Sequence, residues 1–151
     1  VYGPSVKANF KKLLWIIHKG FPLPFKNTKN KRSYIYIKNL VALIYECSIN
    51  SNANNKIFLA SDMKDISTPE LITKLKKLFN SRTFLFSLDQ SFLNFLFKII
   101  NQKQMLDRLT DSLCISSHDS FSDLRFTPPY SLDEGLKDTV DWFLDDKRRG
   151  T

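Results

Sequence analysis

Glycine, cysteine and long apolar runs are all scarce in this 151-residue sequence, and each scarcity excludes a class of site. The four glycines are widely separated, at Gly3, Gly20, Gly135 and Gly150. They therefore cannot form the glycine-rich turn that holds a dinucleotide phosphate at a helix N-terminus. Cys47 and Cys114 stand alone in apolar surroundings, which predicts reduced packing residues of a cytoplasmic protein rather than a disulfide or a zinc site. Charges interrupt every apolar stretch before it could span a membrane.

Further classes of protein are disfavoured by the termini, the histidines and the composition. No secretory signal peptide is present, and the chain begins with valine, so residue 1 is not expected to be the natural start. His18 and His118 lack further ligand residues at metal-binding spacing, so we expect no metal site. With 42% hydrophobic residues, the chain can bury the core of one domain or of part of a larger one.

The formal net charge of +8 raises the question of a nucleic-acid partner. The basic residues are spread along the sequence, and the phenylalanines fall in apolar runs typical of a core rather than among the charges. A small basic nucleic-acid-binding domain therefore stays a secondary hypothesis, and we expect no nucleic acid as partner. The one tight cluster, formed by Lys26, Lys29, Lys31 and Arg32, is a candidate anion site.

Two helices are predicted in the first third of the chain. Residues 9–19 carry apolar side chains at helical spacing, and Gly20 is placed to end that helix. Asn39 is placed to cap a second helix. The residues of this second helix predicted to face inward are Leu40, Leu43, Ile44 and Cys47.

Two capping boxes predict further helices. In the first, Ser67 and Glu70 begin a helix that ends near residue 80. In the second, Ser131 and Glu134 begin a helix near the C-terminus. The inward residues of this last helix are predicted as Leu136, Val140 and Phe143.

Short strands are predicted at residues 33–37, 56–60 and 83–86, with an extended piece at 23–25. The fold class is therefore α/β, with few short strands and several helices. Such a thin sheet suggests a domain that packs against a structure outside itself. The almost wholly apolar run at residues 92–100 is expected to be buried in a core or against a partner surface, and residues 145–151 form a charged tail.

Several short motifs, in order along residues 1–143, resemble the C-terminal half of one enzyme family. They are Val1-Tyr2-Gly3-Pro4, Pro22-Leu23-Pro24-Phe25, Arg32-Ser33-Tyr34-Ile35-Tyr36, Phe58-Leu59-Ala60-Ser61-Asp62, Leu124-Arg125-Phe126-Thr127-Pro128 and Leu132-Asp133-Glu134-Gly135-Leu136. The ordered set is similar to the extended short-chain dehydrogenases/reductases of the NAD-dependent epimerase/dehydratase family, which act on nucleotide sugars. The resemblance implies a substrate-binding C-terminal subdomain at residues 1–144.

The resemblance also implies what this sequence does not contain. In the family, an N-terminal Rossmann domain binds NAD(P) and carries the catalytic tyrosine and lysine, four residues apart on one helix. Tyr34 and Lys38 share that spacing, but they straddle the end of a predicted strand, so we interpret Tyr34 as a packing or substrate-contact residue. We therefore expect no catalytic and no cofactor-binding residues in this chain, and we expect the chain to be inactive alone.

By resemblance, five residues are candidates for binding a UDP-sugar. Arg32 matches an arginine that grips the diphosphate, a task that suits its planar fork of donors. Asn9 is similar to a nucleotide-contacting asparagine, with an ordinary helix cap as the alternative. The main chain from Leu23 to Phe25 resembles the edge that reads the uracil ring, and Arg108 is a second candidate phosphate ligand.

The leading hypothesis is the substrate-binding part of a UDP-glucose 4-epimerase-like enzyme of polysaccharide biosynthesis. A UDP-4-keto-sugar reductase of the same family is the alternative, and a non-functional remnant is a further one, resting on departures from the family pattern. Those departures are Ser5, Ser116, Asp119, Arg125 and Phe126. Family members are often homodimers, and an apolar face exposed by loss of the Rossmann half predicts that the isolated chain self-associates.

Overall fold

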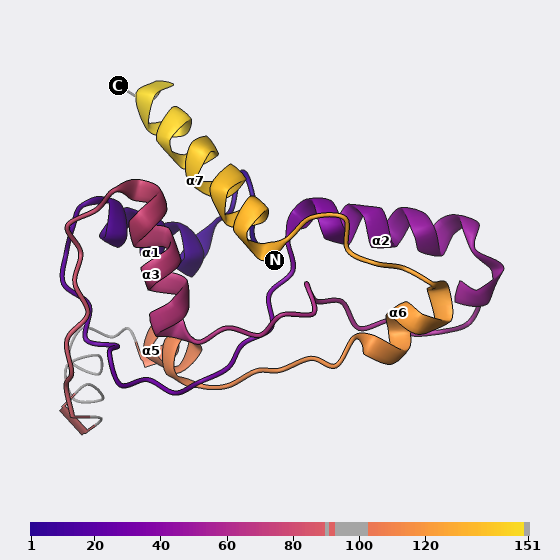
Figure 1. The fold of residues 1–151 in the computed structure, drawn as a ribbon, viewed down its shortest axis with the longest axis horizontal. Helices are drawn as coiled ribbons and strands as arrows, with labels where there is room; N and C mark the ends of the chain where they lie inside the picture. Colours follow the sequence, from indigo (N-terminus) through magenta and orange to yellow (C-terminus); the bar gives the residue numbers. More distant parts are fainter. Residues whose placement is uncertain (90, 93–102, 150–151) are drawn as a thin grey trace. The chain divides into compact units, whose positions relative to one another are not determined.

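The computed structural model describes residues 1–89, 91–92 and 103–149 and divides the chain into two compact units (Figure 1). Unit 1 comprises Val1–Val6, Ser33–Asp65 and Cys114–Thr151. Unit 2 comprises Lys7–Arg32 and Ile66–Leu113. Each unit is thus assembled from segments that are distant in the sequence.

Unit 2 is built on the packing of α1 (Ala8–His18) against α3 (Thr68–Phe79), and it also contains α5 (Lys103–Thr110). Both α1 and α3 bury an apolar face, as the predicted helical spacing requires. Gly20, at φ +77°, follows the end of α1 in a conformation that suits glycine. The capping box of Ser67 and Glu70 opens α3 as predicted, and the left-handed Asn80 ends it.

Extended segments of unit 2 are joined by single bridges rather than by strands. Leu23 pairs with Leu85 and Phe25 with Ser87, so the predicted strand at residues 83–86 is realised only as a short paired stretch. Arg32 pairs with both Ile66 and Leu113. These pairings fix the main chain on either side of residues 26–31, which we call the basic turn.

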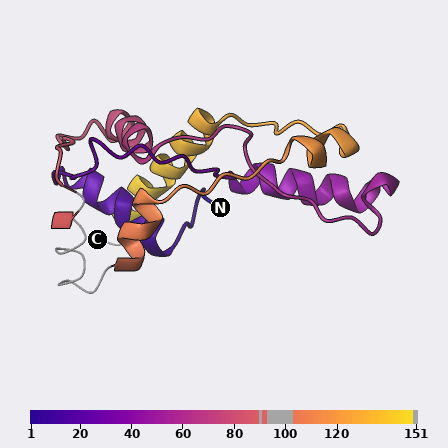
Figure 2. The ribbon, with the colours of Figure 1, turned by 90° about the horizontal axis from the view of Figure 1, so that it is seen from below.

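Unit 1 contains α2 (Ile37–Ile49), the short 3-10 helix η1 (Ser51–Ala53), α6 (His118–Leu124) and α7 (Leu132–Arg149). Figures 1 and 2 both show α6 alongside α2. Leu43 of α2 meets Phe121 and Leu124 of α6 in a buried cluster. Phe58 and Ala60 pack against this cluster, which we call the Leu43 cluster.

The N-terminal segment of unit 1 packs against α7. Tyr2 pairs with Tyr36 in a parallel bridge, and Gly135 of α7 faces both rings. A Cβ atom at position 135 would lie 2.7 Å from the Tyr2 hydroxyl, so only glycine fits there. The second predicted capping box, Ser131 with Glu134, is confirmed at the start of α7, and the predicted inward residues of α7 are buried.

The structure corrects two predictions about α2. Asn39 does not cap this helix, because α2 begins at Ile37 and places Asn39 inside its first turn. Ile44 does not face inward and is 60% exposed, whereas Leu43 is buried as predicted. The sequence pattern failed here because α2 is apolar on several faces, so periodicity could not select the buried one.

The predicted strands and one cysteine also need correction. Residues 33–37 contribute a single bridge at Tyr36, and residues 56–60 form no strand. The apolar composition of residues 56–60 also predicts that the strand is buried, which is wrong for Ile57, since its side chain is 92% exposed. Cys114 is exposed and so is not the packing residue that was predicted.

The end of α7, the apolar run at residues 92–100 and the question of a membrane-spanning helix complete the description of the fold. Helix α7 continues to Arg149, whereas the charged tail was predicted to begin at position 145. Of the apolar run at residues 92–100, positions 93–100 lie outside the described residues. Within the described part of the chain, no helix combines the length and the apolar character needed to cross a membrane.

Candidate functional site

Arg32 lies at the centre of a small crossing of main-chain segments in unit 2. Its amide N–H donates to the carbonyl of Ile66 at 3.0 Å, and its carbonyl accepts from the Ile66 amide at 3.1 Å. The amide of Leu113 donates to the carbonyl of the preceding Lys31 at 2.9 Å. The guanidinium Nη1 donates to the carbonyl of Asp111 at 2.9 Å. This contact orients the half-buried side chain while leaving other donors of the fork for a ligand.

Asn30, two residues before Arg32, holds this crossing together. It is buried, and its Oδ1 accepts from the Thr68 amide at 3.0 Å. Its Nδ2 lies within hydrogen-bonding distance of Thr68 Oγ1 and of the carbonyls of Leu109 and Asp111, at 3.1, 3.2 and 3.3 Å. Asn30 thereby joins the basic turn to the start of α3 and the end of α5.

The other predicted ligands of a UDP-sugar lie on three different elements. Arg108 is exposed on α5, and Asn9 is half-buried as the second residue of α1. The helix cap of α1 is Lys7, so Asn9 is not an ordinary cap. The side chains of Leu23 and Phe25 are buried, which leaves only their main chain for contact with a ligand.

The main chain at residues 23–25 is partly engaged already. The Leu23 amide donates to the carbonyl of Phe84 at 3.0 Å, and the Phe86 amide donates to the Leu23 carbonyl at 3.1 Å. This pairing makes residues 23–25 a fixed edge. A fixed main-chain edge of this kind is suited to binding a planar ring such as the predicted uracil.

All five predicted ligand residues belong to unit 2, and so does most of the positive charge. Unit 2 contains 15 Lys and Arg residues against 4 Asp and Glu residues, a net +11. Unit 1 contains 8 basic residues against 11 acidic ones, a net −3. The charge that looked evenly spread along the sequence is therefore concentrated by the fold. A strongly basic unit attracts anions such as a diphosphate.

Unit 1 carries a different group of polar side chains, which ties its segments together. The Tyr2 hydroxyl donates to Asp62 Oδ2 at 2.9 Å, and Asn39 Nδ2 donates to Asp62 Oδ1 at 2.7 Å. The Tyr36 hydroxyl donates to Asp138 of α7, which also pairs with Lys38 at 3.1 Å. These contacts are structural in character, because each joins two elements of the unit.

Tyr34 and Lys38 do not form a catalytic pair on one helix. Lys38 is the second residue of α2 and pairs with Asp138, whereas Tyr34 precedes the helix. The Tyr34 ring lies edge-on to Tyr2, with centroids 6.3 Å apart. This ring contact is a packing contact, and a contact of Tyr34 with substrate stays a prediction.

Asp138 gives unit 1 a pH-dependent contact. The hydrogen bond from Tyr36, and after it the Lys38 ammonium, lowers the pKa of this carboxyl below its ordinary value. A lowered pKa in the folded state means that the ionised group stabilises the fold above the ordinary aspartate pKa, near 4. That stability is then lost as the pH falls towards the lowered value.

We therefore expect Asp138→Asn to destabilise the chain at pH 7 by about 1 kcal/mol, since the carboxylate is partly exposed and screened. The difference from the unsubstituted chain should shrink as the pH falls from about 5 to about 3. Urea unfolding across that range measures both effects. Asp141→Asn is the matched control on the same helix, because Asp141 makes only an exposed pair with Lys137. Parallel pH profiles for the two variants would contradict the role given to Asp138.

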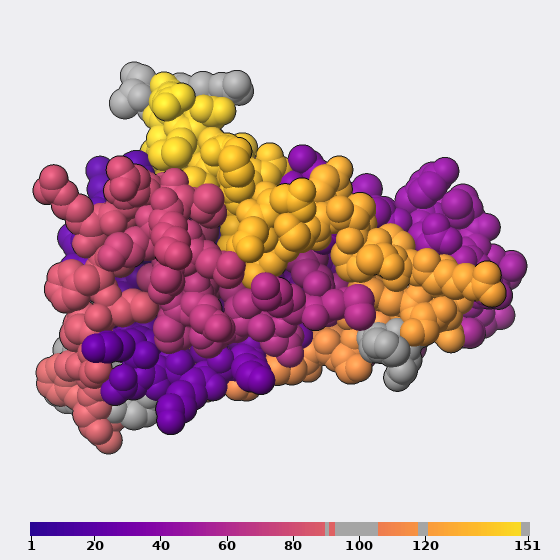
Figure 3. Space-filling model, viewed as in Figure 1, coloured from indigo at the N-terminus to yellow at the C-terminus, as the bar shows by residue number. Residues whose placement is uncertain are grey.

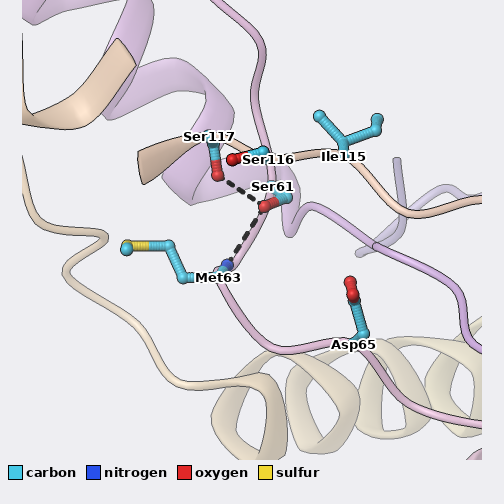
Figure 4. A pocket seen from close by; sticks show the side chains of 6 residues that line it. All are labelled: Ser61, Met63, Asp65, Ile115, Ser116 and Ser117. Carbon is cyan, nitrogen blue, oxygen red and sulfur yellow. Dashed lines mark hydrogen bonds between the residues drawn. The ribbon is translucent and has the colours of Figure 1, made fainter. Parts of the chain in front are cut away.

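A pocket of ≈ 270 Å³ lies within unit 1 and is lined by Ser61, Met63, Asp65, Ile115, Ser116 and Ser117 (Figure 4). Two of its hydroxyls, on Ser61 and Ser117, bind each other at 2.6 Å. Ser61 Oγ also accepts from the amide of Met63 at 3.2 Å. None of the five predicted ligand residues lines this pocket, so it is not the predicted site.

The three described glycines do not form a turn that could bind the phosphates of a dinucleotide cofactor. Gly3 packs against Ile37, Gly20 follows the end of α1, and Gly135 packs against Tyr2. Each of these three glycines thus has a packing or turn role of its own, and none belongs to a phosphate-binding turn. Among the described residues, no group of three histidine, cysteine or acidic side chains is placed to hold a metal ion.

The sequence missed the residues that organise both units. Asn30 was not singled out among the lysines of its polar turn, Asp62 was noted only as the last residue of a family motif, and Asp138 belonged to no motif. A single sequence holds no signal for them, because their partners are 23 to 102 residues away. Only the fold brings those partners together.

Several known proteins with similar sequence or structure are nucleotide-sugar epimerases or reductases. The chain is 38% identical over 150 residues to UDP-glucose 4-epimerase of Vibrio cholerae, covering 99% of this chain and 46% of that protein. The crystal structure of UDP-glucose 4-epimerase from Thermotoga maritima with UDP-glucose matches with a TM-score of 0.67 at 16% identity, over 97% of this chain and 44% of that one. No protein-family model matches the chain.

Two further structures share the fold. The Bordetella bronchiseptica enzyme WbmF, in complex with NAD+ and UDP, matches with a TM-score of 0.67 at 20% identity, over 94% of this chain and 37% of that one. GDP-mannoheptose C4 reductase from Campylobacter jejuni, with NADP bound, matches with a TM-score of 0.65 at 16% identity, over 95% and 46%.

The fold and the sequence together match a C-terminal part of an extended short-chain dehydrogenase/reductase. This chain is homologous to UDP-glucose 4-epimerase and to related nucleotide-sugar epimerases and reductases. The chain spans less than half the length of the curated relative that it matches.

Proposed function

We propose that this chain is the substrate-binding part of a UDP-sugar epimerase and that unit 2 holds the nucleotide diphosphate. The observation that carries the proposal is the match of nearly the whole chain to a UDP-glucose 4-epimerase. Its support in the structure is that Arg32, Arg108, Asn9 and residues 23–25 all belong to the one strongly basic unit.

In this proposal, Arg32 donates to the diphosphate, and its contact with the Asp111 carbonyl sets the direction of the fork. Arg108 adds a second positive charge from α5. The fixed main chain at residues 23–25 offers the edge on which the uracil lies. The residues of this chain bind and orient the substrate.

The chemistry of epimerisation is assigned to groups outside this chain. An NAD cofactor, when bound, supplies hydride transfer at the sugar C4, and the described residues offer no turn for its phosphates. A UDP-4-keto-sugar reductase part is the second candidate, favoured by the shared fold of the C4 reductase from Campylobacter jejuni. Both candidates assign the same binding task to unit 2.

The purified 151-residue chain is expected to bind UDP but to show no C4 epimerisation of UDP-glucose with added NAD. Calorimetric titration with UDP, UMP and uridine measures the first part, and we expect UDP to bind most tightly because it carries two phosphates. A coupled assay for epimerised sugar measures the second part. Equal affinities for UDP and uridine would contradict the proposed binding of the diphosphate by unit 2. Turnover by the chain would mean that catalytic residues lie within this sequence.

A further inference from the structure

The outer face of α1 carries an exposed aromatic pair. Trp15 is 41% exposed, and Phe21, just after the helix, is 49% exposed. Their rings pack against each other, with centroids 5.8 Å apart. The buried face of α1 is formed by Leu13, Leu14 and Ile17, so Trp15 lies on the side of the helix away from the core. The pair is therefore an apolar surface feature that the core of unit 2 does not use.

Positive side chains lie around this pair. Lys12 and Lys19 are exposed, three residues before and four residues after Trp15, so they lie on the same side of the helix. Arg82 is exposed close to Gly20, because a Cβ atom built on Gly20 would lie 3.7 Å from the Arg82 Cβ. We call the five exposed side chains the Trp15 patch; they are Lys12, Trp15, Lys19, Phe21 and Arg82.

Acidic residues are absent from the two segments that form this patch. Residues 7–32 contain eight lysines and arginines and no aspartate or glutamate. Residues 71–88 contain four lysines and arginines and again no acidic residue. The four acidic residues of unit 2 all lie outside these segments of its sequence. The patch therefore combines exposed aromatic rings with positive charge that no acidic neighbour in the sequence offsets, and this combination attracts an anionic surface.

We infer that the Trp15 patch binds the surface of an anionic lipid membrane, with its two rings at the depth of the lipid headgroups. Tryptophan is enriched at this depth because its ring is apolar while its N–H group can stay hydrated. Lysine and arginine place their apolar stems along the rings and keep their charged ends among the lipid phosphates. Charge complementarity identifies the partner, since each lysine or arginine near an anionic leaflet strengthens binding by roughly fivefold.

A lipid surface fits these residues better than a nucleic acid does. A base stacks on the open face of an aromatic ring, whereas Phe21 already packs against the Trp15 ring. Binding at a membrane surface also requires no helix that spans the bilayer. Membrane binding by the Trp15 patch is independent of the nucleotide binding proposed for unit 2, because Arg32 is not part of the patch.

The fluorescence of Trp15 tests the inference directly. The sequence has two tryptophans, so Trp142→Phe leaves Trp15 as the only one. The 151-residue chain is titrated with vesicles of equal parts phosphatidylcholine and phosphatidylglycerol, and separately with vesicles of phosphatidylcholine alone. With the anionic vesicles we expect a blue shift of the emission and quenching by brominated acyl chains. Both effects should weaken at high salt and be nearly absent with phosphatidylcholine alone.

Sedimentation with the anionic vesicles measures the part played by the rings. Trp15→Ser and Phe21→Ser should each weaken binding by about tenfold or more, because each removes apolar surface from the lipid contact. Ile57→Ser is the matched control, since Ile57 is 92% exposed but belongs to unit 1. It should leave vesicle binding unchanged, and a thermal melt of each variant confirms that the chain is folded.

The part played by the charges is measured with double variants. Lys12→Gln combined with Lys19→Gln should weaken binding by roughly 25-fold, about fivefold for each charge. Lys26→Gln combined with Lys29→Gln is the matched control, because it removes the same charge from the basic turn of the same unit, which Figure 3 shows in violet at the molecular surface. The control should cost less than about threefold, since only charges near the leaflet act strongly.

Three results would overturn the inference. The first is an emission of Trp15 that the anionic vesicles leave unchanged. The second is an equal loss of affinity in the two double variants, because binding would then follow the net charge of unit 2 alone. The third is quenching of Trp15 by single-stranded polyuridylate without any response to vesicles, which would assign the patch to a nucleic acid.

Discussion

Arg32→Ala is expected to weaken the binding of UDP by roughly 10- to 150-fold. The substitution removes charge-assisted hydrogen bonds to the diphosphate, and bonds to charged groups contribute about 1.5–3 kcal/mol. Arg32→Lys should recover only part of the affinity, because lysine keeps the charge but lacks the planar fork. Calorimetric titration at one salt concentration gives the affinities for comparison.

Lys29→Ala is the control for Arg32, since Lys29 is exposed in the same basic turn. It should cost well under about 1 kcal/mol of binding free energy if it contributes only to a diffuse positive field. Equal losses for Arg32→Ala and Lys29→Ala would reject a specific grip by Arg32 and favour attraction by the basic unit as a whole. A thermal melt of each variant checks that the contact of Arg32 with the Asp111 carbonyl is not needed for folding.

Asn30→Ala should destabilise the chain by about 2–4 kcal/mol, the largest effect expected in the basic turn. Truncation leaves the buried Thr68 amide without its acceptor and removes the Nδ2 donor shared among three oxygens. Each buried group left unsatisfied costs about 1–3 kcal/mol. Urea unfolding followed by circular dichroism measures the loss. UDP binding should weaken as well, because the Asp111 carbonyl that orients Arg32 loses its support.

Two further variants make the Asn30 prediction specific. Asn27→Ala, at an exposed position in the same turn, should change stability by less than about 0.5 kcal/mol. Asn30→Asp keeps the acceptor for the Thr68 amide but turns a carboxylate oxygen towards the Leu109 carbonyl, so it should also destabilise. If Asn30→Ala proves as mild as Asn27→Ala, the crossing around Arg32 is held by its main-chain pairings alone.

Some features could be predicted from the sequence because their causes are local. Both capping boxes join residues three positions apart, so the sequence contains both partners and the helices begin where predicted. The ordered motifs led to the family in the same direct way, and the comparisons confirm it. The helix at residues 9–19 was found by its single apolar face and by the glycine after it.

What the sequence could not supply depends on distant partners. Residues 56–60 have the composition of a buried strand, but burial and pairing need a neighbouring strand, and the described part of the chain places none beside them. Asn39 is of a residue type favoured at helix caps, yet it lies within the first turn of α2, where its Nδ2 donates to Asp62 and to the Tyr130 carbonyl. Local propensity is a weak prior that tertiary contacts override.

The sequence by itself therefore determined the family, the main helices with their capping boxes, and the residues expected to grip a nucleotide. The tertiary structure alone decided that those residues belong to one unit with a net charge of +11 and that Asn30 joins the segments around Arg32. It also decided which apolar side chains of α2 are left exposed. The physical reason is range: caps and helical periodicity act within a turn, whereas charge concentration, buried hydrogen bonds and exposed faces arise only when distant segments meet.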